Sequence, residues 1–291
     1  MYDFSIILAS VINGTMTGAV YALVALGLTL IYGVLHIINF AHGSMLMLAM
    51  FGAYFLYALL GLDPYLALPL VAAVAFVLGY GLQRTVIGKT SHGRDEIILL
   101  VTLGISIIIE NAALFFFTAN ERLVTLPYDI EGIDLGVTFL VVPQLAAFGA
   151  SLVITLLLWL FMARTDTGRA IRAVAKERLG ARLVGIDVDH IFAISFGIGT
   201  ACVGAAACLL VPTFPVTPQT GYVFVLVAFT VVVLGGMGSF IGALIGGFII
   251  GIAESVGGLF FGQTLGQIAI SLIFITVLLF RPTGLFGQKL R

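Results

Sequence analysis

Residues 13–48 read NGTMTGAVYALVALGLTLIYGVLHIINFAHGSMLML, and this stretch decides the fold class. It belongs to an apolar run, Phe4–Leu35, that is longer than the roughly 20 residues a helix needs to cross a bilayer. The segment His36–Gly43 then interrupts two apolar runs. Non-helical backbone at membrane depth is tolerated only where protein buries it or where it lines a watery cavity. Two interpretations stay open: the segment lines something at depth, or it is a tight turn in which Asn39 caps the next helix and His42 is solvated.

The composition extends this apolar character to the whole chain. Of the 291 residues, 61% are hydrophobic and only 9% are charged, and the mean hydropathy is +1.20. Soluble globular domains carry about 25% charged residues. The sequence therefore predicts an all-α polytopic membrane protein in which residues 1–291 form a single transmembrane domain. The N-terminus lacks the basic region of a cleaved signal, so we expect the first span to be retained.

Apolar runs separated by polar connections predict about nine transmembrane helices, within a range of eight to ten. The first is over-long and the seventh is short. The predicted spans are Phe4–Leu35, Gly43–Leu62, Tyr65–Ile87, Glu96–Thr118, Thr138–Ala163, His190–Val211, Tyr222–Gly235, Phe240–Leu259 and Gly262–Phe280.

Basic residues gather on one side of this nine-span arrangement. Of the thirteen Lys and Arg residues, Arg122 alone falls on the other side. Cytoplasmic loops retain Lys and Arg during insertion, so we expect an external N-terminus and a cytoplasmic C-terminus. The cytoplasmic group comprises Arg84, Lys89, Arg94, the stretch Arg164–Arg182, Arg281, Lys289 and Arg291. The external side carries Asp3, Asp63, Glu121, Asp129, Glu131 and Asp134.

The basic stretch Arg164–Arg182 reads RTDTGRAIRAVAKERLGAR and has helical spacing. Its cations Arg169, Arg172 and Lys176 fall on one face, away from the apolar positions. Thr165 or Asp166 can cap the first turn, and Gly180 followed by Gly185 predicts a break into two short helices. The apolar positions are Ile171, Val174 and Ala175.

This loop, at about residues 164–190 and expected to be cytoplasmic, has two interpretations. A basic amphipathic helix can lie on anionic lipid and serve topology alone. A docking surface is favoured instead, because small side chains let a partner approach the backbone closely and a lipid-binding helix would carry Trp, Phe or more Leu. The small residues are Ala170, Ala173, Ala175, Gly180, Ala181 and Gly185.

Three blocks of sequence resemble the LivH-type permeases of branched-chain amino acid ABC importers. The run TGRAIRAVAKERLGARLVGIDVDHIFAISFGIGTACVGAAA is similar to the family's cytoplasmic loop and following helix. Residues 13–48 resemble its opening signature, and RPTGLFG resembles its C-terminal end. The blocks span almost the whole chain in the family's order.

The resemblance implies a permease in a bacterial inner membrane, working with several partners. These are a second homologous permease subunit, expected to make a hetero-dimer, two cytoplasmic ATPase subunits and an external solute-binding protein. It also implies that the cytoplasmic loop docks in a groove of an ATPase. The residues that take this coupling role are Arg169, Arg172, Lys176, Glu177, Ala181 and Gly185.

The sequence offers no motif for chemistry by this chain alone. It lacks the GxxxxGK[ST] phosphate loop, so we expect ATP to be used by partner subunits and no cofactor or metal to be bound here. A membrane enzyme using His36, His42 or His190 is disfavoured, because no two of these histidines have the spacing of a metal pair. Cys202 and Cys208 lie six residues apart in one span and are interpreted as small core residues.

Polar and glycine positions inside the spans are the candidates for a translocation path or gate. Gly14 and Gly18 have the spacing of a close helix contact, as do later glycine rows. These rows are Gly238, Gly242 and Gly246, then Gly247 and Gly251, then Gly258, Gly262 and Gly266. The stretch at residues 234–240 predicts a second break or re-entrant turn. The path or gate candidates are Asn13, Tyr21, Asn39, His42, Glu110, Glu254, Gly236 and Gly238.

Two carboxylates, Glu110 and Glu254, lie inside predicted spans. Each costs about 2.5–3.5 kcal/mol if ionised at the centre of a helix, so each needs water, a proton or a polar partner. They are either functional or interhelical hydrogen-bonding groups, and Asn13, Thr15 and Thr102 were the expected partners. An ion-coupled carrier using one of them is the alternative to an ABC permease. The solute also stays open among branched-chain amino acids, urea, amides and aromatic acids.

Overall fold

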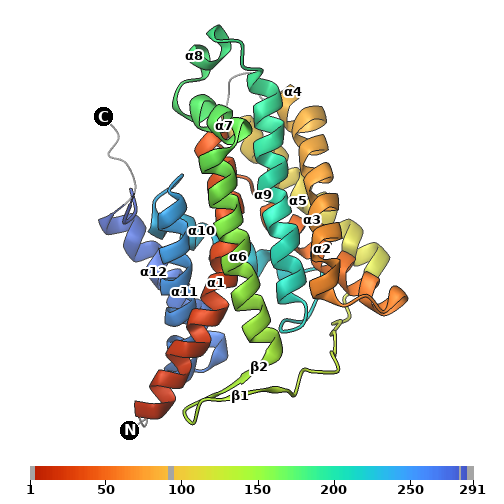
Figure 1. Ribbon diagram of the computed structural model, residues 1–291, viewed down its shortest axis with the longest axis vertical. Helices are drawn as coiled ribbons and strands as arrows, with labels where there is room; N and C mark the ends of the chain where they lie inside the picture. Colours follow the sequence, from red (N-terminus) through yellow and green to blue (C-terminus); the bar gives the residue numbers. More distant parts are fainter. Residues whose placement is uncertain (1–3, 91–94, 282, 287–291) are drawn as a thin grey trace.

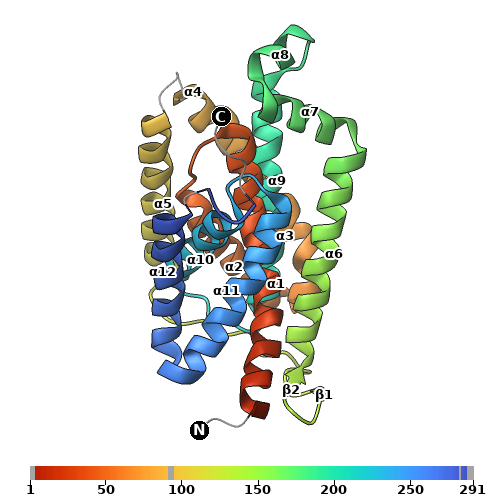
Figure 2. The same ribbon diagram turned by 90° about the vertical axis from the view of Figure 1, so that its left-hand side faces the viewer.

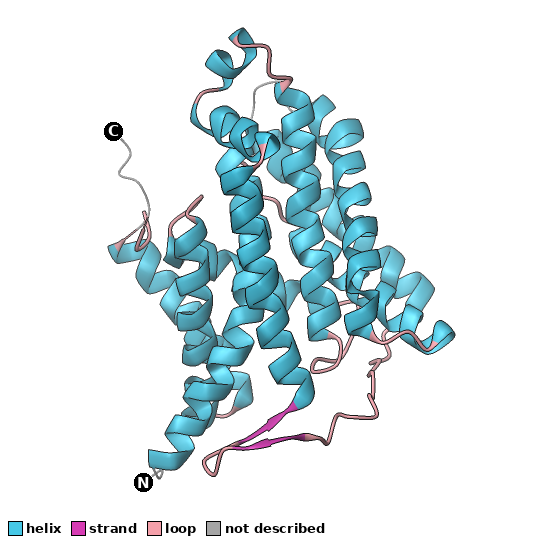
Figure 3. Cartoon of the chain, viewed as in Figure 1, coloured by secondary structure: helices cyan, strands magenta, loops and turns pink. Residues whose placement is uncertain are grey.

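The structure, a computed structural model, describes residues 4–90, 95–281 and 283–286. It is a helical bundle with a small β-hairpin at one end (Figures 1 and 3). Within the described residues, seven helices are long and apolar enough to cross a membrane, and two further apolar helices are shorter. The predicted all-α polytopic class is confirmed. Asp3, Arg94, Lys289 and Arg291, named above for the side on which they fall, lie outside the described residues.

The helices follow the predicted spans. The first span is over-long, and the seventh, Thr220–Gly235, is short. The helices are α1 (Phe4–Leu35), α2 (Ala41–Leu60), α3 (Pro64–Leu82), which continues through a π-helical turn (Gln83–Ile87) into α4 (Gly88–Thr90), α5 (Asp95–Phe117), α6 (Val142–Arg164), α7 (Asp166–Lys176), α8 (Arg178–Leu183), α9 (Val188–Leu210), α10 (Thr220–Gly235), α11 (Phe240–Phe261) and α12 (Gln263–Phe280).

The fifth span begins later than predicted because a β-hairpin precedes it. Strand β1 (Gly132–Asp134) pairs antiparallel with β2 (Phe139–Val141), and Ile133 lies opposite Leu140. Thr138 was predicted to start the helix, but the chain is extended until Val142. Pro143 then occupies the first turn of α6, where its missing N–H costs nothing.

Helices α1 and α9 form the centre of the bundle. The apolar window of each is 83% buried, against 17–39% for the other long helices. Helix α1 packs against α11, α9, α10 and α6, whereas α9 packs against α3, α1 and α2. Figure 2 shows α6 on one side of this central pair and α5 and α12 on the other. Cys202 and Cys208 are buried and unpaired in α9, which confirms that they are core residues.

The connection from α5 to α6 is tied to the end of the bundle where α1 begins. The Tyr57 hydroxyl donates to the Thr125 carbonyl at 2.5 Å, and the Tyr128 hydroxyl donates to the Asp63 carboxylate. Burial and this bond to Asp63 raise the pKa of Tyr128 well above its usual value, so the phenol remains a donor at physiological pH. Arg122 donates to the Phe117 carbonyl at 2.7 Å and lies over the ring of Tyr54.

Glycines bring α1 and α11 into backbone contact. A Cβ at Gly251 would lie 2.4 Å from both the Gly14 carbonyl oxygen and the Gly18 Cα, and one at Gly247 would collide with Ala22. This confirms that Gly14, Gly18 and the row Gly247 and Gly251 face another helix. Gly262 differs from its predicted row, because it has φ of 90° and separates α11 from α12 with nothing within 4 Å of its missing Cβ.

We predict that Gly251→Ala lowers the melting temperature of the detergent-solubilised protein. The added methyl group overpacks a backbone contact, which costs about 1–3 kcal/mol. Gly104→Ala is the matched control, because no atom lies within 4 Å of that position in α5. The control is expected to keep or raise the melting temperature, because alanine is favoured over glycine in a helix by up to about 1 kcal/mol. Equal melting temperatures for the two variants would contradict the contact.

Candidate coupling and translocation sites

Two breaks interrupt the helices, as the sequence predicted. The first spans residues 36–40 and begins at His36, whose φ is 57°; the second spans residues 236–239 and contains Gly236 and Gly238 with φ of 97° and 84°. A Cβ at Gly33 would lie 3.5 Å from the Gly238 Cα, so the end of α1 adjoins the second break. The positive φ explains the two glycines, because L side chains rarely adopt this conformation.

Asn39 and His42 are fully buried beside the first break. The Asn39 side-chain oxygen accepts the Ala41 N–H at 3.0 Å, but the N-cap position of α2 is Phe40, which makes no side-chain cap. The interpretation of His42 as a solvated residue is wrong, because its Nε2 lies 3.0 Å from the Val24 carbonyl oxygen of α1. Asn39 Nδ2 and His42 Nδ1 have no partner among the described residues.

The segment after α12 completes the second break. The N–H groups of Leu285 and Phe286 donate to the carbonyls of Leu234 and Gly235 at 2.8 and 3.1 Å. These carbonyls belong to the last turn of α10, which otherwise lacks intrahelical donors. The described part of the closing RPTGLFG motif therefore stabilises the end of a helix that stops inside the bundle.

Glu110 joins three helices through hydroxyl groups. Its carboxylate accepts hydrogen bonds from Ser44 of α2 at 2.9 Å and Ser106 of its own helix at 3.2 Å, and the Tyr222 hydroxyl of α10 lies near it. The side chain is only 8% exposed. This geometry is that of an interhelical packing group.

Glu254 and Tyr21 form a second polar contact, between α11 and α1. Asn13, another path candidate, bonds Thr138 before α6 at 3.4 Å. Neither carboxylate has the partner that the sequence predicted. Thr102 accepts a hydrogen bond from the Phe40 N–H, and the Thr15 hydroxyl donates to a carbonyl of its own helix. The partners missed were Ser44, Ser106, Tyr21 and Tyr222, which are brought together only by the packing of distant helices.

The loop between α6 and α9 consists of two short helices, α7 and α8, at one end of the bundle (Figure 1). Thr165 caps α7 by accepting the Gly168 N–H at 3.0 Å, as predicted. The predicted break at Gly180 is wrong: the chain turns at Glu177, whose φ is −156° and whose carboxylate caps α8 through the Leu179 N–H. Gly180 lies inside α8, and Gly185, with φ of 86°, ends the pair. Helix α7 therefore ends at Glu177, whose side chain caps α8, and not at Gly180.

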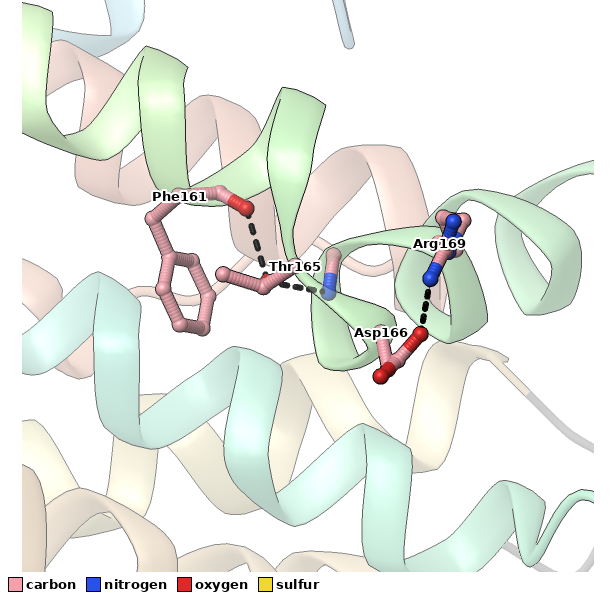
Figure 4. Close-up of polar contacts among 5 residues, drawn as sticks. Phe161, Thr165, Asp166 and Arg169 are labelled. Atoms are coloured by element: carbon pink, nitrogen blue, oxygen red, sulfur yellow. Dashed lines mark hydrogen bonds and ion pairs between the residues drawn. The ribbon is translucent and has the colours of Figure 1, made fainter.

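The loop presents cations and apolar side chains to its surroundings. Ile171 and Val174 are buried against the bundle, which confirms the predicted amphipathic face. Five of the coupling candidates are exposed: Arg169, Arg172, Lys176, Glu177 and Gly185. Arg169 forms an ion pair with Asp166 (Figure 4). Ala181 is buried, so it supports this surface without forming it. The apolar tip of α8, not predicted, consists of Leu179, Leu183 and Val184, which are 71%, 88% and 76% exposed.

Arg178 ties the loop to the first break, a contact that sequence reasoning missed. Its guanidinium donates to the Leu35 carbonyl at 2.6 Å and lies 5.1 Å from the centre of the Phe192 ring. The Leu35 carbonyl belongs to the last turn of α1 and so lacks an intrahelical donor. The two residues are 143 positions apart. In the sequence, nothing distinguishes Arg178 from the five other Lys and Arg residues of the stretch Arg164–Arg182. Its contact with Leu35 is seen only in the folded structure.

Comparisons with known proteins agree with this architecture. Residues 10–281 match the family described as "Branched-chain amino acid transport system / permease component". The chain belongs to this family. It is 34% identical to the permease protein BraD of Pseudomonas aeruginosa over 97% of this chain and 96% of that protein. It is 32% identical to the permease protein LivH of Escherichia coli K12 over 98% and 97%.

A solved structure has the same fold. The structure titled "PsaBC from Streptococcus pneumoniae in complex with Fab" matches 94% of this chain and 92% of its own with a TM-score of 0.50. The identity is 18%, so the likeness concerns the fold alone. Membership of the permease family and the apolar helices make the chain a multi-pass inner-membrane protein. As a permease component of an ABC transporter it is not an enzyme, because ATPase activity lies in separate subunits.

We predict that Arg178→Gln speeds amide hydrogen exchange in the last turn of α1 and lowers the melting temperature. The variant leaves the Leu35 carbonyl without its charged donor, and a hydrogen bond to a charged group contributes about 1.5–3 kcal/mol. Arg182→Gln is the control, since Arg182 of the same helix makes only a 3.6 Å exposed ion pair with Asp189. Unchanged exchange in α1 of Arg178→Gln would show that the contact does not hold the helix end.

Proposed function

We propose that this chain and a second homologous membrane subunit form the pathway by which a branched-chain amino acid enters the cytoplasm. Two ATPase subunits drive the transport, and an external binding protein delivers the solute. The observation that carries the proposal is the pair α7 and α8, which exposes cations and an apolar tip and is bonded through Arg178 to the end of α1. Relatives named for high-affinity branched-chain amino acid transport support the choice of solute.

The end of the bundle that carries α4, α7 and α8 faces the cytoplasm in this proposal. Arg84, Lys89 and the cations of the loop lie at this end, as the bias of Lys and Arg toward cytoplasmic loops requires. Arg122 is the exception at the other end, and its guanidinium is occupied by the Phe117 carbonyl and aromatic rings. The N-terminus is then external and the C-terminus cytoplasmic.

The test of this function is uptake by the assembled complex. Proteoliposomes with both permease subunits, the ATPases and the binding protein should accumulate radiolabelled leucine, isoleucine or valine only with ATP inside. Urea and aromatic acids in place of these amino acids distinguish the solutes that the sequence left open. Uptake by this chain alone would rule out the proposal. Co-purification with a different permease chain, and not with a second tagged copy, tests the hetero-dimer.

The α7–α8 surface is expected to hold the ATPases through both its apolar tip and its charges. Leu183→Asp should reduce the amount of ATPase that co-purifies with the permease, because a carboxylate would replace an 88% exposed apolar side chain at the contact. Lys176→Glu should weaken association chiefly at low salt, since exposed charges are screened.

Lys89→Glu is the matched control for the charge change. Lys89 is exposed at the same end of the bundle but lies in α4, outside the loop. It should leave both ATPase co-purification and membrane insertion unchanged. Full ATPase recovery with Leu183→Asp and Lys176→Glu would mean that the loop is only a topological element.

A further inference from the structure

A cavity of about 470 Å³ lies between α1, α6 and α7, and we call it the inner cavity. Its volume is in the range of small-molecule pockets, about 300–1,000 Å³. Most of its wall is apolar, with Leu158 and Met162 of α6 and Phe240 at the start of α11. Among the described residues that line it, three carry polar side-chain groups, namely Thr29 of α1, Trp159 of α6 and Arg172 of α7.

The inner cavity adjoins a face of α6 that the bundle leaves uncovered. Leu156 and Leu157 on this face are 61% and 58% exposed, and Trp159 is 48% exposed while it also lines the cavity. Helix α6 stands at the side of the bundle (Figure 2). In a multi-pass membrane protein, an apolar helix face in this position contacts acyl chains. The cavity is therefore open to lipid beside Trp159.

Arg172 is the one cation among the described residues that line the inner cavity. It is exposed and has neither an ion pair nor a hydrogen-bond partner within the described parts of the chain. Its neighbours differ, because Arg169 pairs with Asp166 and Arg178 donates to the Leu35 carbonyl. A free guanidinium binds a phosphate group through two parallel N–H···O bonds.

Thr29 adds a buried polar group to the opposite wall of the inner cavity. It is 4% exposed, and its hydroxyl has no hydrogen-bond partner among the described residues. Other helical threonines donate to the carbonyl four residues earlier, as Thr17 does to Asn13 and Thr230 to Leu226. A buried hydroxyl without a partner is costly because its desolvation is uncompensated. An occupant of the cavity that carries an acceptor oxygen removes this cost.

A larger cavity lacks these polar groups. It measures about 710 Å³ and lies between α2, α3 and α5. None of the described residues that line it is charged, and the hydroxyl of Thr200 donates to the Ala75 carbonyl at 2.9 Å. Any acyl chain can fill such a space without regard to its headgroup. The inner cavity differs because a free cation and an unpaired hydroxyl adjoin its apolar wall.

We propose that the inner cavity binds one anionic phospholipid from the leaflet at the α7 end of the bundle. The lipid phosphate pairs with Arg172, an ester carbonyl accepts the Thr29 hydroxyl, and an acyl chain lies along Leu158, Met162 and Phe240. Bilayer chains are as apolar as this wall, so the headgroup decides which lipid binds. The apolar tip of α8 lies outside the cavity, so the lipid leaves it free for an ATPase. Lipid binding here does not depend on which solute the complex carries.

The test uses Trp159, the single tryptophan of the 291 residues. Bromine atoms on an acyl chain quench indole fluorescence on contact. The full-length chain is reconstituted in phosphatidylcholine vesicles that contain increasing fractions of brominated phosphatidylglycerol or brominated phosphatidylcholine. One nearby cation should let the anionic lipid reach half-maximal quenching at an about fivefold lower mole fraction. Equal half-saturation by the two lipids, or no saturating quenching by either, would overturn the proposal.

Arg172→Gln should remove the preference for the anionic lipid, so that both brominated lipids quench alike. Lys89→Gln is the matched control, because it removes the same charge at the same end of the bundle but outside the cavity. It should keep the preference of the wild type. An equal loss of preference in the two variants would assign the effect to general surface charge and would contradict a site at Arg172.

Two further variants test the cavity itself without changing its charge. Ala175→Leu places a larger side chain in the lining of the cavity, and leucine has nearly the helix propensity of alanine. It should abolish the saturating quenching by both lipids. Thr29→Val should raise the half-saturating fraction of both lipids about three- to tenfold, because both carry ester carbonyls. Wild-type quenching curves in either variant would show that the lipid lies outside the cavity.

Discussion

The structure depends on one constraint, that a helix ending inside an apolar bundle must find donors for its last carbonyls. Two helices end in this way, α1 at Leu35 and α10 at Gly235. Arg178 supplies the donor for α1, and the backbone of Leu285 and Phe286 supplies donors for α10. In both cases the donor comes from a segment distant in sequence. The loop and the chain end after α12 therefore have to lie against the bundle before either break is stable.

This constraint makes the loop part of the bundle's core. Ile171, Val174 and Ala181 share a buried cluster with Ile31, Val34 and Leu35 of α1. Arg178 adds a charge-assisted hydrogen bond to the same helix end. The α7–α8 pair and the end of α1 are thus joined both by packing and by one directed bond.

Periodicity and composition were enough to predict the spans, both breaks, the amphipathic face of α7 and the burial of the two cysteines, because each follows from local pattern and the apolar solvent. The turn at Glu177 was missed because a side-chain cap competed with Gly180, and pattern cannot decide between them. The partners of Glu110 and the role of Arg178 could not be predicted either. Both are contacts between helices far apart in sequence.

The inner cavity, of about 470 Å³ beside α7, and an outer cavity of about 120 Å³ beside the first turns of α6 differ in what adjoins them. The inner cavity is lined by α1, α6, α7 and the start of α11, and the α7–α8 loop is attached to α6 through Thr165 and to α1 through Arg178. The outer cavity lies beside the first turns of α6, which follow directly from strand β2 of the hairpin. On its other side, α1 packs against α11 through close glycine contacts, which would be lost if the two helices separated. Helix α6 therefore borders both cavities, whereas α1, which also borders them, is held against α11.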